Sequence, residues 1–322
     1  MIQWGILGTG KIASLFAKDF QYVTNGELIA VASRNPDKAH AFAEKHNIRD
    51  VPISYEALAK WENIDAVYIS TPHNRHFGDA KLCLENGKSV LCEKPITVNS
   101  RQLKELQKIA ETNNVYLMEA LWTWFLPAFN KAVEWYEQGR IGDIKMISSA
   151  FGFPAKYDPE GRLYNPELAG GTLLDLGIYN LFTTNRFMNH EPETITAAAS
   201  MADTGVDEHL AVTAIYPGDV IAQLSSAFSC KLQSDAVISG TKGLIRLPRF
   251  WEAKSAILET HGGRETFEDS HPCKGYTYET QAFNEWVLQG KSGVPYPMEM
   301  SLRIMGQMDE IRRQIGLKYP FE

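Results

Sequence analysis

The chain has 322 residues, 44% of them hydrophobic and 22% charged, which is the composition of a globular protein with room for two domains. Its 39 acidic and 32 basic residues give a net charge of −7, and no basic stripe could neutralise the phosphates of a nucleic acid. We see no leader-like N-terminus and no apolar run of about 18 residues, so we expect a cytoplasmic location and no membrane partner. The four scattered cysteines form no CxxC pair, so neither a disulfide framework nor a metal site is expected.

Short apolar runs alternate with amphipathic stretches from residue 2 to about residue 120. This rhythm predicts an α/β domain with a doubly wound parallel sheet and crossover helices. Ser100 is the expected N-cap of the last helix. The expected strands are IQWGILG, LIAVAS, AVYIST, SVLCEKP and VYLMEA, and the expected helices are ASLFAKDFQ, PDKAHAFAEKHN, HFGDAKLCLENG and SRQLKELQKIAETNN.

The pattern changes after residue 121. A helical stretch, PAFNKAVEWYEQGRIG, precedes the strand KMISSAFGF, and residues 194–260 supply closely spaced β-rich segments. Turn signals at Pro217-Gly218 and Gly240 predict a mostly antiparallel sheet, and the last 45 residues look helical again. We therefore predict two tightly joined domains, 1–120 and 121–322, with a cleft between them.

A glycine-rich turn follows the first predicted strand. Gly8, Thr9, Gly10, Lys11, Ile12 and Ala13 form a G-x-G-x-x-A pattern that opens the first predicted helix. Gly8 permits a tight turn, Gly10 lets the backbone approach a pyrophosphate, and the helix N-terminus faces the anion. The pattern predicts a dinucleotide site, and the alternative is a glycine turn without a ligand.

The second predicted strand ends in Ser33-Arg34, where an NAD site usually carries an acidic residue for the ribose 2′-hydroxyl. Ser33 can donate a hydrogen bond to a 2′-phosphate, and Arg34 can add charge and stacking. This favours NADP over NAD as the cofactor. The alternative is that Arg34 is a solvated turn residue.

Polar residues also follow the third and fourth predicted strands. The third runs into Thr71, His73 and His76, and the fourth into Glu93 and Lys94. Both lie at the carboxyl edge of the sheet, where doubly wound folds bind ligands, so we expect all five residues near the cofactor. Pro95 restricts the backbone of Lys94 to extended angles. Taken singly, the lysine and each histidine could be ordinary loop residues.

The stretch PELAGGTLLDLGIYNLF, residues 166–182, places an aspartate in an apolar setting. Asp175 and Tyr179 are four residues apart, so on a helix they share one face. If this face meets the cleft, Asp175, Tyr179 and Lys94 form a group that can move a proton while a nicotinamide moves a hydride. The alternative is a locally paired Asp175 and a core Tyr179.

Three motifs together resemble the glucose-fructose oxidoreductase, inositol dehydrogenase and rhizopine-catabolism family. They are the segment from Gly8 to Ala13, Glu93-Lys94-Pro95, and the run from Gly170 to Tyr179. The resemblance runs nearly end to end. The segments MEALWTWFLP, GTKGLIRLPRFW, YTYE and DEIRRQIGLKYP are similar to the branch of dimeric dihydrodiol dehydrogenases and NADP-dependent D-xylose dehydrogenases.

The resemblance implies an N-terminal Rossmann domain and a C-terminal α/β domain with an open, largely antiparallel sheet that often forms a dimer interface. It implies that Lys94 lies near the nicotinamide and the substrate hydroxyl. Tyr179 would act as acid/base where many sugar dehydrogenases of the family carry histidine. It also implies an aromatic wall at the substrate, made by Trp122, Phe151 and Trp251. The residues after Glu119 depart from the common arginine-containing version, with Trp124 in its vicinity, which leaves the exact substrate open.

We thus predict an NADP-dependent oxidoreductase that acts on a secondary alcohol of a sugar or cyclic diol and assembles as a homodimer or larger oligomer. In this hypothesis Tyr179 takes the alcohol proton, Lys94 favours the phenolate, and Asp175 orients Lys94 or a substrate hydroxyl. No metal is required. One rival is a regulator that binds a dinucleotide without turnover, and another is an NAD-dependent inositol or sugar dehydrogenase of the same fold.

Overall fold

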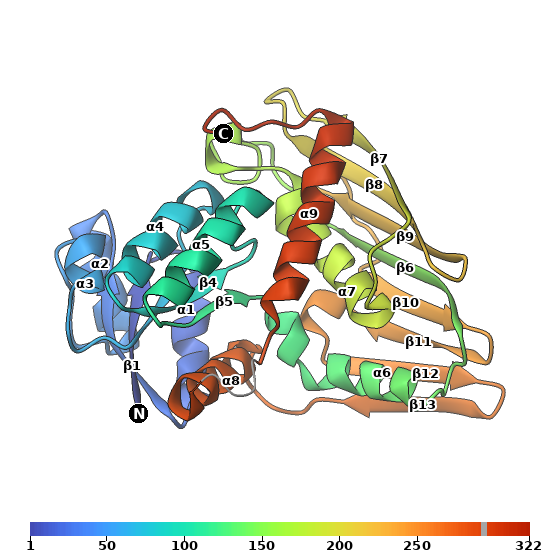
Figure 1. Cartoon of the computed structure of the whole chain (residues 1–322), viewed down its shortest axis with the longest axis horizontal. Helices are drawn as coiled ribbons and strands as arrows, with labels where there is room; N and C mark the ends of the chain where they lie inside the picture. Colours follow the sequence, from blue (N-terminus) through green and yellow to red (C-terminus); the bar gives the residue numbers. More distant parts are fainter. Residues whose placement is uncertain (291–294) are drawn as a thin grey trace. The chain divides into compact units, whose positions relative to one another are not determined.

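The computed structural model describes residues 1–290 and 295–322 (Figure 1). The chain forms two compact units. The first comprises Met1–Trp122 and Pro272–Leu302, and the second comprises Thr123–His271 and Arg303–Glu322. The division near residue 120 resembles the predicted one, but the segment after His271 groups with the first unit instead of continuing the second.

The first unit contains a five-stranded parallel sheet in the order β2-β1-β3-β4-β5, as predicted. Its strands are continuous apolar runs because a parallel sheet is covered on both faces. The strand order reverses direction between β1 and β3, so the loops that follow these two strands flank the position where such sheets bind ligands. The strands are β1 (Ile2–Leu7), β2 (Gly26–Ala32), β3 (Ala66–Ile69), β4 (Ser89–Glu93) and β5 (Leu117–Ala120).

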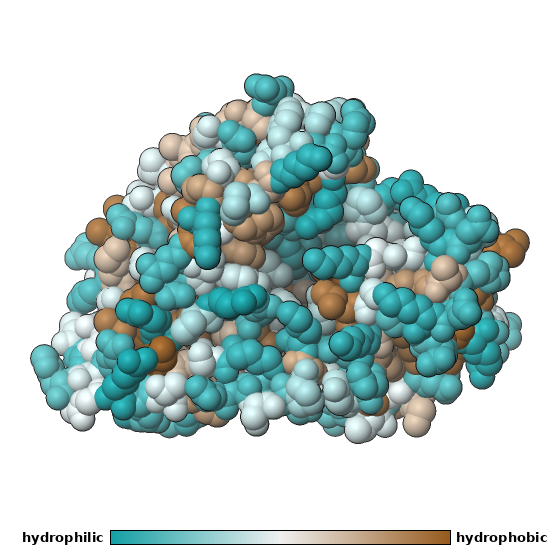
Figure 2. Space-filling view, turned by 180° about the vertical axis from the view of Figure 1, so that it is seen from behind, coloured by the Kyte–Doolittle hydropathy of each residue, from teal (hydrophilic) through white to brown (hydrophobic). Residues whose placement is uncertain are grey.

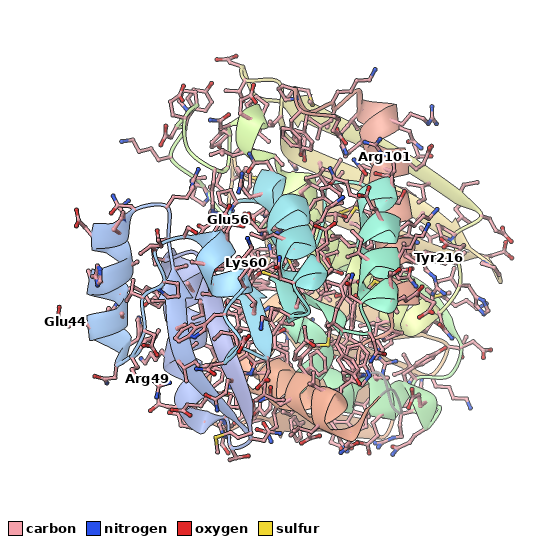
Figure 3. All side chains as sticks on the ribbon, turned by 60° about the vertical axis from the view of Figure 1, so that its left-hand side comes forward. Glu44, Arg49, Glu56, Lys60, Arg101 and Tyr216 are labelled. Atoms are coloured by element: carbon pink, nitrogen blue, oxygen red, sulfur yellow. The ribbon has the colours of Figure 1, made fainter. Side chains whose placement is uncertain are left out.

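The four helices predicted within residues 1–120 are present as α1, α2, α4 and α5, with two differences in detail. The N-cap of α5 is Asn99, whose side chain accepts from the Gln102 N–H at 3.0 Å, so the prediction of Ser100 as the cap was wrong and Ser100 is the first helical residue. The short α3, with Glu56 and Lys60 near its ends (Figure 3), was not predicted because five residues are too few to show a helical period. The helices are α1 (Lys11–Asp19), α2 (Pro36–His46), α3 (Tyr55–Ala59), α4 (His73–Glu85), α5 (Ser100–Thr112) and α8 (Tyr276–Gln289), with a 3-10 turn η1 (Phe20–Tyr22).

A buried carboxylate joins α8 to the first unit. Asp19, at the end of α1 and 4% exposed, accepts hydrogen bonds from the backbone N–H groups of Lys274, Gly275 and Tyr276 at 2.9 to 3.1 Å. These are the N–H groups that a helix leaves unsatisfied at its start, where the helix dipole also favours a negative charge. This contact explains why the chain returns to the first unit after His271.

The second unit contains an eight-stranded sheet in the order β13-β12-β11-β10-β6-β9-β8-β7. Only the β6–β9 pair within it is parallel, which confirms the predicted, largely antiparallel sheet. The last strand, β13, extends the sheet beyond the predicted β-rich range of residues 194–260. The strands are β6 (Ile144–Gly152), β7 (Thr194–Met201), β8 (Asp207–Tyr216), β9 (Val220–Ala227), β10 (Asp235–Gly240), β11 (Gly243–Pro248), β12 (Ser255–Thr260) and β13 (Gly263–Glu268).

Helices cover one face of this sheet. In Figure 1, α6 (Pro127–Glu137) lies along β11 to β13 and α7 (Ile178–Met188) lies on β6 and β9. A single π-helical turn (Leu173–Gly177) leads directly into α7. The last helix, α9 (Met298–Ile315), begins in the first unit and ends in the second. The remaining short turns are η2 (Trp122–Phe125), η3 (Pro166–Leu168) and η5 (Phe250–Glu252).

Side chains on the opposite face of this sheet are exposed. Met146, Ile215 and Ile221 are 37%, 37% and 42% exposed and neighbour one another across β6, β9 and β8, while their chain neighbours Ile147 and Ala222 are buried. Figure 2 shows one surface on which hydrophobic residues are scattered among hydrophilic ones.

None of the helices in the described ranges has both the length and the apolar character needed to cross a bilayer.

Candidate active site

The turn after β1 is shaped for an anion. Gly8 has φ +102°, and a Cβ there would lie 3.0 Å from the Ser70 carbonyl oxygen at the end of β3, so only glycine fits. Gly10 is the N-cap of the nine-residue α1, and among the described residues nothing lies within 4 Å of a Cβ built on it. No acidic side chain stands in the first turn, where Lys11 and Ile12 are exposed. The space and the N–H groups fit the pyrophosphate of a dinucleotide.

The end of β2 carries the predicted ribose-side residues. The Thr9 hydroxyl donates to Ser33 Oγ at 3.4 Å, and Ser33 Oγ also accepts from the Asn35 N–H at 3.3 Å, so Ser33 lies beside the glycine turn. Arg34 is exposed. This arrangement joins the glycine turn to the end of β2 within the first unit.

A second cation near Arg34 was missed from the sequence. Burial raises the pKa of Tyr55 at the start of α3 and Asp79 adds to the rise, whereas the guanidinium groups of Arg34 and Arg75 oppose it. Both arginines therefore lie within electrostatic range of one phenol. Arg75 is fixed on α4 by an ion pair with Asp79 at 2.8 Å, and Asp79 accepts from the Thr71 hydroxyl at 2.7 Å.

The His76 side chain bridges the loop after β3 and the loop after β4. It is 1% exposed, with Nδ1 2.8 Å from the Pro95 carbonyl oxygen and Nε2 2.8 Å from the Thr71 carbonyl oxygen. Burial lowers the pKa of His76, while the two carbonyl acceptors act in the opposite direction because donation to both requires the imidazolium form. The His73 ring lies 5.6 Å away. That His73 and His76 contact the cofactor stays a prediction.

Two carboxylates hold the backbone around Lys94, which is joined to Pro95 by a cis peptide bond. Glu93 accepts from the Tyr68 hydroxyl and from the Lys94 N–H at 3.2 Å. Glu119, buried at the end of β5, accepts from the Ile96 N–H at 2.9 Å and the Ser301 hydroxyl at 2.5 Å. Burial raises the pKa of Glu119, and these donors and the Lys94 ammonium oppose the rise. Lys94 thus projects from a segment fixed on both sides.

In the second unit, Asp175 lies in the π-helical turn and Tyr179 in the first turn of α7, each 7% exposed. The start of this helix is held by Asp207 of β8, which accepts from the Thr172 hydroxyl and the Leu173 N–H, both at 2.7 Å. Burial raises the pKa of Asp207 to about 6. Asp175 and Tyr179 were expected to share one face of a helix, and the structure places them on either side of a π-to-α junction.

Gly170 and Gly171 do more than form a tight turn. They let the backbone lie closer to neighbouring atoms than a residue with a side chain could. A Cβ on Gly170 would lie 2.7 Å from the Leu163 carbonyl oxygen, and one on Gly171 would lie 2.2 Å from Asp207 Oδ1. Gly171 has φ +115° and donates its N–H to the Leu163 carbonyl at 2.9 Å. The loop before the two glycines is therefore pressed against the start of the helix that carries Asp175 and Tyr179.

Aromatic side chains of the second unit stand beside Tyr179. The rings of Phe151 and Trp251 are stacked, with centroids 3.7 Å apart and planes 9° apart, and the Phe151 centroid is 6.1 Å from that of Tyr179. Trp122 belongs to the first unit, where its ring lies 4.6 Å from that of Tyr276. Among the described residues its Nε1 finds no hydrogen-bond partner.

The predicted site residues thus form two groups. Tyr179, Phe151 and Trp251 gather within the second unit. Asp175, four residues before Tyr179, pairs with Arg162, which the sequence did not single out. Lys94, Trp122 and the predicted cofactor residues belong to the first unit. The group in the first unit includes a glycine turn whose shape fits a dinucleotide, and the group in the second unit contains a phenol and a carboxylate, groups that can exchange a proton.

Comparisons with known proteins identify the class of protein. The model of an oxidoreductase family with an NAD-binding Rossmann fold matches residues 2–121, and that of the GFO/IDH/MocA C-terminal domain matches residues 129–246. The chain belongs to the GFO/IDH/MocA oxidoreductase family. It is 38% identical to a trans-1,2-dihydrobenzene-1,2-diol dehydrogenase of Xenopus laevis, over 99% of both chains, and 33% identical to the Homo sapiens protein of that name, over 99% of this chain and 98% of the relative.

Solved structures lead to the same class. KijD10, a 3-ketoreductase from Actinomadura kijaniata in complex with NADP and TDP-benzene, superposes with a TM-score of 0.88 at 26% identity over 98% of both chains. An aldose-aldose oxidoreductase from Caulobacter crescentus shares the fold, with a TM-score of 0.88 at 22% identity over 97% of both chains. The chain is an enzyme, an NAD(P)-dependent dehydrogenase of this oxidoreductase family.

The raised pKa of Asp207 generates a stability prediction. A carboxyl whose folded pKa is about 6 binds its proton more tightly than in the unfolded chain, so its contribution to stability is present below about pH 4 and is lost as the pH rises to about 6. Asp207→Asn keeps an acceptor for Thr172 and Leu173 without this titration. Relative to the unaltered protein, we expect the variant's free energy of unfolding to rise by about 2–3 kcal/mol between pH 4 and 7, measured by urea denaturation. A pH-independent difference between the two proteins would contradict the assignment.

Proposed function

We propose that the protein is an NADP-dependent dehydrogenase that transfers a hydride between its cofactor and a secondary alcohol or carbonyl of a cyclic trans-diol or a sugar. The observation that carries this proposal is the position of Tyr179 beside the stacked rings of Phe151 and Trp251, with the carboxylate of Asp175 four residues before it in the chain. A flat aromatic wall suits the apolar face of a ring, and the two polar groups suit its hydroxyls. The whole-length similarity to trans-diol dehydrogenases supports the same substrate class.

In the proposed reaction Tyr179 takes the proton of the reacting hydroxyl, and bound NADP supplies the hydride acceptor. The mechanism requires the Lys94 ammonium at the same substrate oxygen, where it stabilises developing negative charge and favours the phenolate of Tyr179. The bonds to Glu93 and Ile96 fix the backbone from which Lys94 projects, so its position is set before substrate binds. Asp175 accepts a hydrogen bond from another substrate hydroxyl.

The preference for NADP is supported by the residues beside Ser33. Arg34 and Arg75 place two positive charges around Tyr55, near the end of β2. A 2′-phosphate gains charge-assisted hydrogen bonds from guanidinium groups, whereas an NAD site would place a carboxylate there. The 26%-identical KijD10 was crystallised with NADP.

The open face of the eight-stranded sheet is the proposed dimer interface. The neighbouring Met146, Ile221 and Ile215 are exposed at its middle strands, and a flat sheet face of this kind can pack on its own copy with two-fold symmetry. A stable interface buries about 800 Å² on each partner. A face of eight strands is large enough to supply this area.

The acid/base roles predict the effect of two substitutions. Lys94→Ala and Tyr179→Phe should each lower kcat for NADP reduction by about 100-fold or more, because general acid–base groups contribute on this scale. NADPH binding, followed by protein fluorescence, should persist in Tyr179→Phe. Tyr136→Phe on α6 is the matched control and should keep full activity. Near-normal turnover by folded Lys94→Ala and Tyr179→Phe would contradict these roles. If the unaltered protein binds NADPH tightly but turns over no diol or sugar, the result would favour a dinucleotide-sensing regulator.

Cofactor preference tests the ribose-side residues. Arg34→Asp should lower kcat/KM for NADP by about 100-fold, because it removes a charged partner of the phosphate and adds repulsion, and should improve the relative use of NAD. Arg101→Asp on α5 makes the same charge change elsewhere (Figure 3) and should leave the preference unaltered. The readout is the ratio of kcat/KM values from absorbance assays. An unchanged ratio in Arg34→Asp would refute the role of Arg34.

The dimer interface is tested by a charge in its centre. Ile221→Asp should convert the dimer to a monomer in light scattering, because a desolvated carboxylate is costly in an interface. Leu288→Asp, at an exposed hydrophobic residue of α8, is the matched control and should stay dimeric. A monomeric unaltered protein, or an Ile221→Asp variant that stays dimeric, would refute the proposed interface.

A further inference from the structure

The loop between β6 and the π-helical turn is fixed next to Asp175. The Leu163 carbonyl accepts the Gly171 N–H at 2.9 Å, and the Asn165 carbonyl accepts the Gly170 N–H at 3.0 Å. Tyr164 is 3% exposed, with its ring centroid 5.7 Å from that of Phe228. The backbone that flanks Arg162 is thereby anchored at the residues that follow it.

Arg162 reaches from this anchored loop to the carboxylate of Asp175. Its Nη1 lies 3.2 Å from Asp175 Oδ1, and the two side chains are 56% and 10% exposed, respectively. Asp175 stands between the buried Leu174 and Leu176, where an ionised carboxylate without a partner would be costly. The guanidinium offsets this cost while its exposed part remains hydrated.

We propose that Arg162 is a positioning residue that holds Asp175 ionised and oriented as the acceptor for a second substrate hydroxyl, next to the one that reacts at Tyr179. The inference rests on the proposed function and deepens it by assigning the residue that orients the acceptor of the second hydroxyl. Asp175 lies in the π-helical turn and Tyr179, four residues later, in the first turn of α7, so both side chains can serve neighbouring positions of one ring. A site built to bond a hydroxyl rejects an analogue that lacks it.

The ion-pair geometry also explains why an arginine suits this position. An ionised carboxylate accepts hydrogen bonds but donates none, so a substrate hydroxyl must donate to it. The planar guanidinium fork restrains the carboxylate plane, which the single rotating ammonium of lysine does less well. Lysine would therefore preserve the charge and lose part of the orientation.

The test compares trans-1,2-cyclohexanediol with cyclohexanol, which differ by the second hydroxyl. The unaltered protein should prefer the diol in kcat/KM, and Arg162→Ala should reduce this preference about tenfold, mainly through KM for the diol, with cyclohexanol little affected. Arg162→Lys should recover part of the preference. In an Asp175→Asn background, Arg162→Ala should have no further effect, because it acts through the carboxylate. Arg140→Ala removes a matched ion-pair arginine, bonded to Glu265 at 2.9 Å, and should keep the preference.

Several results would overturn the role of Arg162. An unchanged diol preference in Arg162→Ala, or an equal loss for both alcohols, would show that it does not act on the second hydroxyl. If Arg162→Ala fails to fold, an Arg162→Lys variant with the full preference would refute the orientation argument. Absence of turnover by the unaltered protein with NADP or NAD on any diol or sugar would instead refute the proposed function, and this role with it.

Discussion

The backbone N–H groups of Ile96 and Leu173 both donate to buried carboxylates, Glu119 in the first unit and Asp207 in the second. The first bond lies two residues from Lys94, and the second lies at the start of the helical segment that carries Tyr179. A buried carboxylate destabilises the folded state unless hydrogen-bond donors surround it. If the segment that supplies the donors moved, the carboxylate would lose these bonds, so the segment is held in place. The same reasoning applies to Asp19 and the start of α8. Rigid placement of the site is therefore a consequence of charge burial.

Backbone contact makes the second unit's site equally rigid. Gly170 and Gly171 stand where any side chain would strike the Leu163 carbonyl or Asp207. The loop that contains Leu163, strand β8 and the start of the helix therefore pack closely together here. Arg162 then reaches Asp175 because the residue after it is bonded to Gly171. The glycine pair thus positions a side chain that lies eight residues earlier in the chain.

The parts of the structure that follow local patterns could be predicted from the sequence. The parallel strands appear as continuous apolar runs, and Gly8 and Gly10 stand in a spaced motif after a strand, so both were recognised. Asn99 and Ser100 are adjacent residues of equally good capping type, and nothing local decides between them. The contacts of Asp19 with residues 274–276 and of Arg162 with Asp175 depend on chain segments meeting in space, which a linear pattern does not record.

Two carboxyls of the first unit, Glu279 and Glu93, lie near one another beside the segment that carries Lys94. Burial, with Glu93 and Asp19 nearby, raises the pKa of Glu279 well above its usual range, and neither of its oxygens has a hydrogen-bond partner among the described residues. Two neighbouring carboxyls in a dry interior do not both ionise readily, so Glu279 favours its neutral form. Glu93 by contrast accepts from the Tyr68 hydroxyl and the Lys94 N–H. The two carboxyls therefore differ in role, because the repulsion between them is relieved at Glu279 while Glu93 keeps the bonds that hold the backbone of Lys94.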